Sequence, residues 1–153
     1  MPRVQRSADV TWEGDVARGS GTISAETGAF DGLGFSLATR VGAPAGKTSP
    51  EELLAAAHAG CYAMSLASEL AQAGTTPERL EVTATVTLDE VEGGSHRIVS
   101  SGVHVRARGD GIELDGLEQA ARAADEGCPF SALIKASATV DIDVELQGGT
   151  NGD

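Results

Sequence analysis

Residues 48–64 read TSPEELLAAAHAGCYAM and carry the pattern that decides the fold. Ser49 stands directly before Pro50, and Glu52 follows at the third helical position. A serine that can cap a helix, a proline at the first helical position and a glutamate at the third form a capping box with the favoured proline placement. The stretch therefore predicts a helix that begins at Pro50.

This helix is predicted to continue to Ala73 and to end at Gly74, a residue typical of helix C-termini. At 1.5 Å per residue it would be about 36 Å long, comparable with the width of a small domain. No charged residue occurs between Leu53 and Ser68. A helix that is apolar or small on every side is buried on every side, so we expect a sheet or a second subunit to cover it.

The rest of the chain alternates between strand and helix patterns. The first forty residues indicate strands joined by glycine turns, and residues 41–47, VGAPAGK, indicate a loop. Alternating apolar and polar residues predict strands over 81–89, 99–105 and 138–146, and helices are predicted over 114–126 and 130–135. This order predicts an α+β fold. We expect one domain over residues 1–146 and a disordered tail over 147–153.

Charge and composition exclude several classes of function. The formal net charge is −12, and the 11 basic residues form no run, so nothing favours binding to nucleic acid or to an anionic membrane. The first ten residues, MPRVQRSADV, lack the apolar core of a signal peptide, and no uncharged stretch is long enough to span a bilayer. We therefore expect a cytoplasmic protein.

The two cysteines lie 67 positions apart, at Cys61 and Cys128. Cys61 falls in the middle of the long helix and is either a nucleophile or a small buried hydrophobic residue. The middle of a helix offers no free N–H groups, so a reactive Cys61 needs a cation nearby. Cys128 precedes Pro129 at the start of a short helix, where backbone N–H groups favour the thiolate. In a cytoplasmic protein such cysteines are more often catalytic, redox-active or buried than joined in a structural disulfide.

Three further residues are candidates, each with an ordinary alternative. His58 lies three positions before Cys61 on the same helix face, so it is either half of a Cys–His pair or a buried, hydrogen-bonded histidine. Arg40 and Glu51 are candidates for charged residues at a site. The ordinary alternative for Arg40 is a solvated cation at the end of a strand, and that for Glu51 is an acid that complements the helix dipole. Two cysteines and three dispersed histidines give no zinc-like spacing, and we expect no metal or cofactor.

Three stretches of the sequence together resemble the OsmC/Ohr family of organic hydroperoxide reductases, and its OsmC branch in particular. They are TWEGD at 11–15 with the glycines that follow, TSPEELLAAAHAGCYAM at 48–64, and GCP at 127–129 with Ser131. The resemblance covers about residues 8–146. It implies antiparallel sheets wrapped around long buried central helices in an intertwined homodimer.

The resemblance also implies roles for single residues. Cys61 stands where the family has its peroxide-attacking cysteine, and Cys128 where it has the resolving one. Glu51 matches the glutamate of the family's Pro-Glu motif, and Arg40 resembles the arginine that the OsmC branch pairs with the reactive thiolate. Arg18 is the alternative, because the Ohr branch draws its arginine from an earlier turn.

Helix geometry supports the dimer separately. Glu51 and Cys61 are ten positions apart, which is about 15 Å of rise on a regular helix, and they lie on different sides of it. If both residues serve one site, they must come from different subunits.

The implied activity is reduction of organic hydroperoxides, and less efficiently of hydrogen peroxide, through a Cys61 sulfenic acid and a Cys61–Cys128 disulfide. A dithiol of the lipoyl type, in preference to thioredoxin, would then reduce that disulfide. Two alternatives remain open. One is a binding protein with two structural cysteines, and the other is an acyl-transfer enzyme that uses Cys61 and His58.

Overall fold

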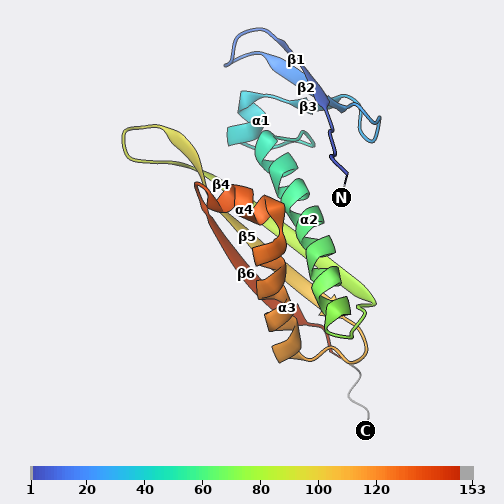
Figure 1. Ribbon diagram of the computed structural model, residues 1–153. Helices are drawn as coiled ribbons and strands as arrows, with labels where there is room; N and C mark the ends of the chain where they lie inside the picture. The colour runs from blue at the N-terminus through green and yellow to red at the C-terminus, as the bar shows by residue number, and fades with distance from the viewer. Residues whose placement is uncertain (1, 149–153) are drawn as a thin grey trace. The chain divides into compact units, whose positions relative to one another are not determined.

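The computed structural model describes residues 2–148 (Figure 1). The chain falls into two compact units that divide between Leu53 and Leu54, and each unit contains one three-stranded sheet. Our expectation that residues 1–146 form a single domain stays a prediction. Residues 147 and 148 belong to no helix or strand, and the rest of the predicted tail lies outside the described residues.

The first unit is a small antiparallel sheet followed by a short helix. Its elements are β1 (Ala8–Glu13), β2 (Ser20–Ala25), β3 (Leu33–Phe35) and α1 (Leu37–Val41), with the strands in the order β1-β2-β3. The strands joined by glycine turns that the sequence predicted are confirmed. The helix α1 was not predicted, because five residues are too few to establish a helical period.

The long helix α2 (Pro50–Gln72) begins at the predicted residue and ends one residue before the predicted end. The Ser49 hydroxyl accepts a hydrogen bond from the Glu52 N–H at 3.1 Å, as the capping motif predicts. The Glu52 carboxylate does not complete the box in the expected way, since it accepts instead from the Thr48 hydroxyl at 2.9 Å. The start of the helix is thus held by two side-chain contacts within the first unit.

The second unit packs helices against a mixed sheet. From Leu54 onward it contains the remainder of α2, then β4 (Arg79–Glu90), β5 (His96–Arg108), α3 (Leu114–Gly127), α4 (Pro129–Lys135) and β6 (Thr139–Leu146). The strand order is β4-β5-β6, and Figure 1 shows α3 and α4 lying over this sheet. The helices and strands predicted for this region are confirmed, with small differences at their ends.

One strand pair differs from the expectation of antiparallel sheets. β4 and β5 are antiparallel, but β6 runs parallel to β5. The cause is the connection, because α3 and α4 carry the chain back to the end of the sheet where β5 began. A strand that returns through such a crossover pairs parallel to its predecessor.

The core of the second unit lies between α2, α3 and the inner face of β5. Its residues pack in one cluster and are buried: Tyr62, Leu66, Leu70, Val103, Val105, Ala107, Ile112, Leu117, Ala120, Ala121, Ala124 and Cys128. The buried side of α2 carries Tyr62, Leu66 and Leu70, spaced four residues apart. The opposite row carries Ala56, Gly60, Met64 and Ser68, and it is exposed in the single chain. The expected burial of this helix on every side is therefore not met by one chain alone.

A bulge aligns the inner faces of β4 and β5. The register shifts between Thr87 and Leu88, so that Leu88 pairs with Ile98 and Val86 pairs with Ser101. Without the extra residue, all side chains of β5 on one side of the bulge would face the opposite surface of the sheet. The register therefore places a serine, Ser101, in the buried face of the sheet.

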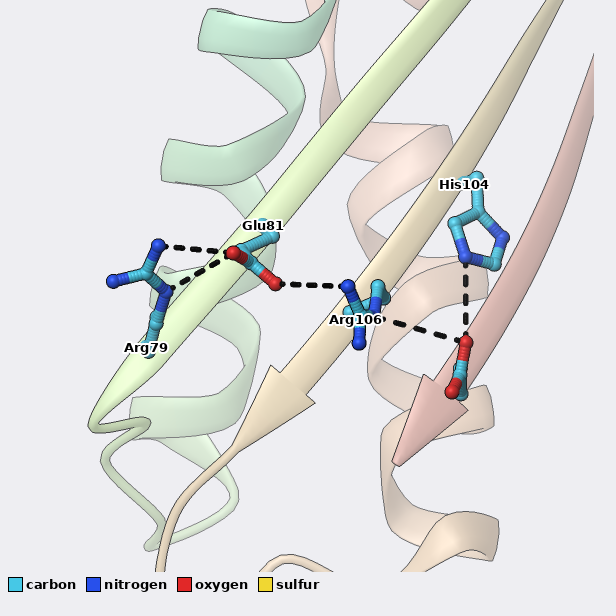
Figure 2. Close-up of polar contacts among 5 residues, drawn as sticks. Arg79, Glu81, His104 and Arg106 are labelled. Atoms are coloured by element: carbon cyan, nitrogen blue, oxygen red, sulfur yellow. Dashed lines mark hydrogen bonds and ion pairs between the residues drawn. The ribbon is translucent and has the colours of Figure 1, made fainter. Parts of the chain in front are cut away.

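The outer face of this sheet is charged and exposed. Figure 2 shows Arg79 beside Glu81 and Arg106 next to them on β5. Glu81 accepts from Arg79 at 2.9 Å and lies 3.5 Å from Arg106, while His104 contacts Asp143 at 2.8 Å. Exposed ion pairs contribute little to stability, so the stabilising contacts of this sheet are those of its opposite face, which packs in the core. Within residues 2–148, no helix is long and apolar enough to cross a membrane.

The packing of α3 predicts a large difference between two leucines three positions apart. Leu117 is fully buried, whereas Leu114 is 47% exposed. We expect Leu117→Ala to lower the free energy of unfolding by about 2–5 kcal/mol, because it removes core contacts and leaves a cavity. Leu114→Ala is the matched control and should change it by less than about 0.5 kcal/mol. Urea denaturation measures both, and equal losses would contradict the observed orientation of α3.

Candidate active site

The candidate residues form two groups, one in each unit. In the first unit, Arg40 lies on α1 and Glu51 lies in the first turn of α2. Nε of Arg40 donates to both carboxylate oxygens of Glu51, at 2.9 and 3.1 Å, and Nη2 donates to Oε1. This is a charge-assisted, two-pronged contact of the kind that fixes a guanidinium in orientation.

Helix caps place both partners of this pair. Ser36 caps α1, since its hydroxyl accepts from the Thr39 N–H at 3.2 Å while the Thr39 hydroxyl accepts from the Ser36 N–H at 3.1 Å. Arg40 is the next residue, in the last turn of α1. The Ser49 hydroxyl caps α2 by accepting from the Glu52 N–H, so a side-chain cap stands at the start of each of the two helices that carry the arginine and the glutamate.

The ion pair stays charged at neutral pH. The hydrogen bond to Glu51 raises the pKa of Arg40 despite the opposing effect of burial. Burial is the largest single effect and would raise the pKa of Glu51. The hydrogen bond from Arg40, the charge of Arg40 and further hydrogen bonds from the backbone and Ser49 together outweigh it, so the pKa of Glu51 lies below its ordinary value.

An apolar hollow lies beside Arg40. It encloses about 220 Å³, and the side chains of Trp12, Val16, Phe35, Leu37 and Pro50 line it together with Ser36 and Arg40. The rings of Trp12 and Phe35 pack at a centroid distance of 5.4 Å. A Cβ atom at Gly21 would stand 2.6 Å from the Phe35 ring, so glycine at this position allows Phe35 to occupy the wall. The hollow therefore offers an apolar chamber with one fixed cation in its lining.

In the second unit, the fold brings the two cysteines together across 67 positions of sequence. Cys61, from the middle of α2, packs against the core cluster that contains Cys128. Both are free thiols; Cys128 is fully buried and Cys61 is partly exposed. Cys128 is the N-cap of α4, and its sulfur accepts from the Ser131 N–H at 3.5 Å.

The surroundings of Cys61 disfavour its thiolate. Burial raises the pKa of the Cys61 thiol, and the neighbouring Cys128 raises it further. The backbone at Phe130 and the Ser65 side chain oppose this shift without overcoming it. A thiol in this environment needs a cation before it can act as a nucleophile at neutral pH.

His58 does not form the Cys–His pair that the sequence left open. It is fully buried, and its ring nitrogens contact the hydroxyls of Ser101 at 2.7 Å and Ser131 at 2.8 Å. With both nitrogens engaged by serines, neither is available to take a proton from Cys61.

Sequence reasoning had assigned no role to Ser101 or Ser131. Ser101 carried no local signal. Ser131 carried one, since it belongs to the third stretch that resembles the OsmC/Ohr family.

Arg18, the alternative cation, lies in the turn between β1 and β2 and is exposed. Its backbone N–H donates to the Asp15 carboxylate at 2.8 Å. Of the two arginines, Arg40 is the one that Glu51 holds. Among residues 2–148, no group of three or more His, Cys, Asp or Glu side chains is arranged to hold a metal ion.

Comparison with known proteins identifies the class. The model of the OsmC-like protein family matches residues 43–143, the segment that contains Glu51, Cys61 and Cys128. The chain belongs to the OsmC-like family, and the resemblance seen in the sequence is confirmed.

Individual relatives agree with this assignment. The chain is 37% identical to the peroxiredoxin OsmC of Escherichia coli over 145 residues, which cover 93% of this chain and 98% of that protein. The organic hydroperoxide resistance protein OhrB of Bacillus subtilis is 25% identical, with a TM-score of 0.71 over 91% of this chain and 98% of that one. An OsmC protein of Legionella pneumophila shares the fold, with a TM-score of 0.74 at 20% identity over 94% of this chain and 99% of that one.

The Arg40–Glu51 contact predicts a coupling energy that depends on pH. Because the pKa of folded Glu51 lies below its ordinary 4.5, the stabilisation is fully present above about that pH and is lost as the pH falls through the folded value. A double-mutant cycle of Arg40→Gln and Glu51→Gln, measured by urea denaturation, should give a coupling of about 1 kcal/mol at pH 7. The coupling should approach zero in acid. A coupling that is unchanged at the lowest pH at which the chain stays folded would contradict this assignment.

Proposed function

We propose that this chain is a cytoplasmic thiol peroxidase that reduces organic hydroperoxides, and less efficiently hydrogen peroxide, in defence against oxidative stress. The observation that carries the proposal is the meeting of two free thiols, Cys61 and Cys128, in the core of one unit. In a protein 37% identical to a peroxiredoxin along almost its whole length, such a pair is well suited to cycle between dithiol and disulfide.

The reaction follows from the chemistry of the two thiols. The Cys61 thiolate attacks the terminal oxygen of the peroxide and the O–O bond breaks, so that Cys61 becomes a sulfenic acid. The alkoxide takes up the proton that the Cys61 thiol gave up and leaves as an alcohol. The Cys128 sulfur then attacks the Cys61 sulfur, the S–O bond breaks and water leaves. An external dithiol, which we propose to be of the lipoyl type, reduces the resulting disulfide by exchange.

The raised pKa of Cys61 explains why a cation is needed, and Arg40 is our candidate. Glu51 fixes the guanidinium, so that its remaining N–H groups can face a thiolate and a peroxide oxygen. Ten positions of regular helix separate Glu51 from Cys61, about 15 Å along the axis. We therefore propose that the site around Cys61 is completed by Arg40 and Glu51 of the partner subunit.

The uncovered side of α2 supports a homodimer. The row formed by Ala56, Gly60, Met64 and Ser68 has no charge, and the Met64 side chain is 76% exposed in the single chain. Small residues at this spacing allow a second backbone to approach closely, and an exposed apolar methionine gains from cover. A second copy of the same helix provides that cover in the intertwined dimer that we propose.

The apolar hollow beside Arg40 supports an organic peroxide as the preferred substrate. Its lining is almost entirely hydrocarbon, so the tail of an alkyl or aryl hydroperoxide gains free energy when it enters. Hydrogen peroxide has no tail and gains nothing from these walls.

The two competing functions, acyl transfer and non-catalytic binding, have less support. The acyl-transfer reading needed His58 as a base for Cys61, and both ring nitrogens of His58 are engaged elsewhere. It also needed an oxyanion hole, and residues in the middle of a regular helix have no free N–H groups to form one. A binding protein with inert cysteines would show no redox change on treatment with peroxide, which the next experiment tests.

The redox pair predicts a defined change in mass. Reduced protein mixed with a small excess of cumene hydroperoxide should lose two hydrogens within the mixing time, and a dithiol should restore them. In Cys61→Ser the loss should be absent. In Cys128→Ser one round should occur and leave a sulfenic acid at Cys61. Intact mass under non-reducing conditions measures all three. Unchanged mass in the wild type, with both thiols titratable after denaturation, would make the cysteines structural.

The hollow predicts a substrate-dependent effect of Val16. This side chain lines the hollow but is 67% exposed, so Val16→Asn should leave the fold intact. We expect kcat/KM for cumene hydroperoxide to fall about tenfold, because a substituted wall loses the gain from burying the aryl group. The value for hydrogen peroxide should change less than twofold. Equal losses for both peroxides would exclude a role of the hollow in substrate selection.

A further inference from the structure

His58 is a fully buried polar side chain that the proposed reaction leaves without a role. His58, Ser101 and Ser131 are all fully buried and come from three different elements, α2, β5 and α4. The imidazole bridges the two hydroxyls at 2.7 and 2.8 Å. Polar groups are buried at a cost unless their hydrogen bonds are satisfied, and this set satisfies both ring nitrogens.

The bridge formed by Ser101, His58 and Ser131 carries no charge, and each of its hydrogen bonds has a defined donor and acceptor. Burial is the largest effect and lowers the pKa of His58; Asp125 opposes it with a smaller effect, and Lys135 lowers the pKa slightly further, so the neutral ring predominates at neutral pH. A neutral imidazole has one N–H donor and one acceptor nitrogen. One serine therefore donates to the ring and the other accepts from it, and the ring has no spare nitrogen for acid–base catalysis.

The bridge ends next to Cys128. The backbone N–H of Ser131, the residue whose hydroxyl contacts His58, donates to the Cys128 sulfur at 3.5 Å. The position of Ser131 thus sets both the start of α4 and the hydrogen-bond partner of the resolving thiol.

The other end of the bridge is rigidly connected to Cys61. His58 precedes Cys61 by three residues within α2, so the two side chains lie on neighbouring turns of the same helix face. The contact between His58 and Ser131 therefore ties the turn that carries one cysteine to the turn that carries the other.

We propose that His58, through its contact with Ser131, is a positioning residue for closure of the Cys61–Cys128 disulfide. This inference rests on the proposed peroxidase function and assigns His58 to its second step. In that step the S–S bond forms, the S–O bond of the sulfenic acid breaks, and the hydroxide takes the Cys128 proton and leaves as water. His58 exchanges no proton or electron.

Disulfide closure is sensitive to such positioning. The bond requires two Cβ atoms about 3.5–4.5 Å apart and a dihedral angle near 90°, so small shifts of either turn remove the reactive geometry. A misplacement of about 1 Å can slow a reaction between held groups by as much as a hundredfold. The attack on the peroxide does not require the Cys128 sulfur, so it depends less than closure does on the position of the turn that carries Cys128.

Two substitutions of His58 provide a matched pair. Gln carries its amide nitrogen near the position of Nε2, which contacts Ser131, whereas Asn carries polar atoms near Nδ1, which contacts Ser101. Each variant is mixed rapidly with cumene hydroperoxide and quenched at intervals with dimedone, which traps sulfenic acid, and intact mass gives both rates. Ser131→Ala, which removes one oxygen atom, and Ser101→Ala, which keeps the contact between His58 and Ser131, complete the set.

We expect every variant to form sulfenic acid at a rate within twofold of the wild type. Closure should slow at least tenfold in His58→Asn and Ser131→Ala, with accumulation of the dimedone adduct and of over-oxidised Cys61. In His58→Gln and Ser101→Ala it should slow less than threefold. Equal closure rates in the Asn and Gln variants, or unchanged closure in Ser131→Ala, would overturn the positioning role while leaving the peroxidase function intact. Absence of both sulfenic acid and disulfide in the peroxide-treated wild type would overturn that function and this inference with it.

Discussion

The helix α2 must bury a long surface that has no charged residue from Leu53 to Ser68, and much of the structure follows from that requirement. One side is satisfied within the chain, where Tyr62, Leu66 and Leu70 pack against β5 and α3. The other side offers a row of small residues with an exposed methionine at its centre. The same apolar surroundings that demand cover also hold Cys61 protonated, because a thiolate is poorly stabilised by hydrocarbon. The packing of α2 and the reactivity of Cys61 are therefore linked, because a second subunit that covers the exposed side of α2 can also supply the cation that Cys61 needs.

Much of the fold could be predicted from the sequence because its signals are local. The Ser49–Pro50 cap marks the start of α2. Strict alternation of polar and apolar residues from Thr139 to Leu146 marks a strand with one solvent-exposed face. The helix α1 has only five residues, and so no period to detect. The parallel pairing of β5 with β6 depends on the route of the chain through α3 and α4, about which alternation within a strand says nothing. Patterns within one element are visible in the sequence, and relations between elements are not.

The same distinction separates the parts of the candidate site. Cys61, Cys128, Arg40 and Glu51 could be named as candidates from the sequence, but their roles could be assigned only because their surroundings resemble a known family. The spacing of the cysteines could not show that they meet, and the structure places them in one core. The bridge formed by His58 and its two serines could not be foreseen at all. It joins three segments that are remote in sequence, and the inward orientation of Ser101 depends on pairing along two strands.

The capping of α4 by a sulfur atom has a consequence of its own. Most helices begin at an oxygen acceptor whose chemistry never changes, whereas α4 begins at the Sγ atom of Cys128. In the disulfide that we propose, Sγ of Cys128 would be bonded to Cys61, and the geometry of this cap would change with that bond. The first turn of α4 would therefore be capped differently in the reduced and the oxidised protein. If the chain cycles between these states as we propose, a reductant that contacts this turn could distinguish the oxidised protein from the reduced one by the conformation at the start of α4.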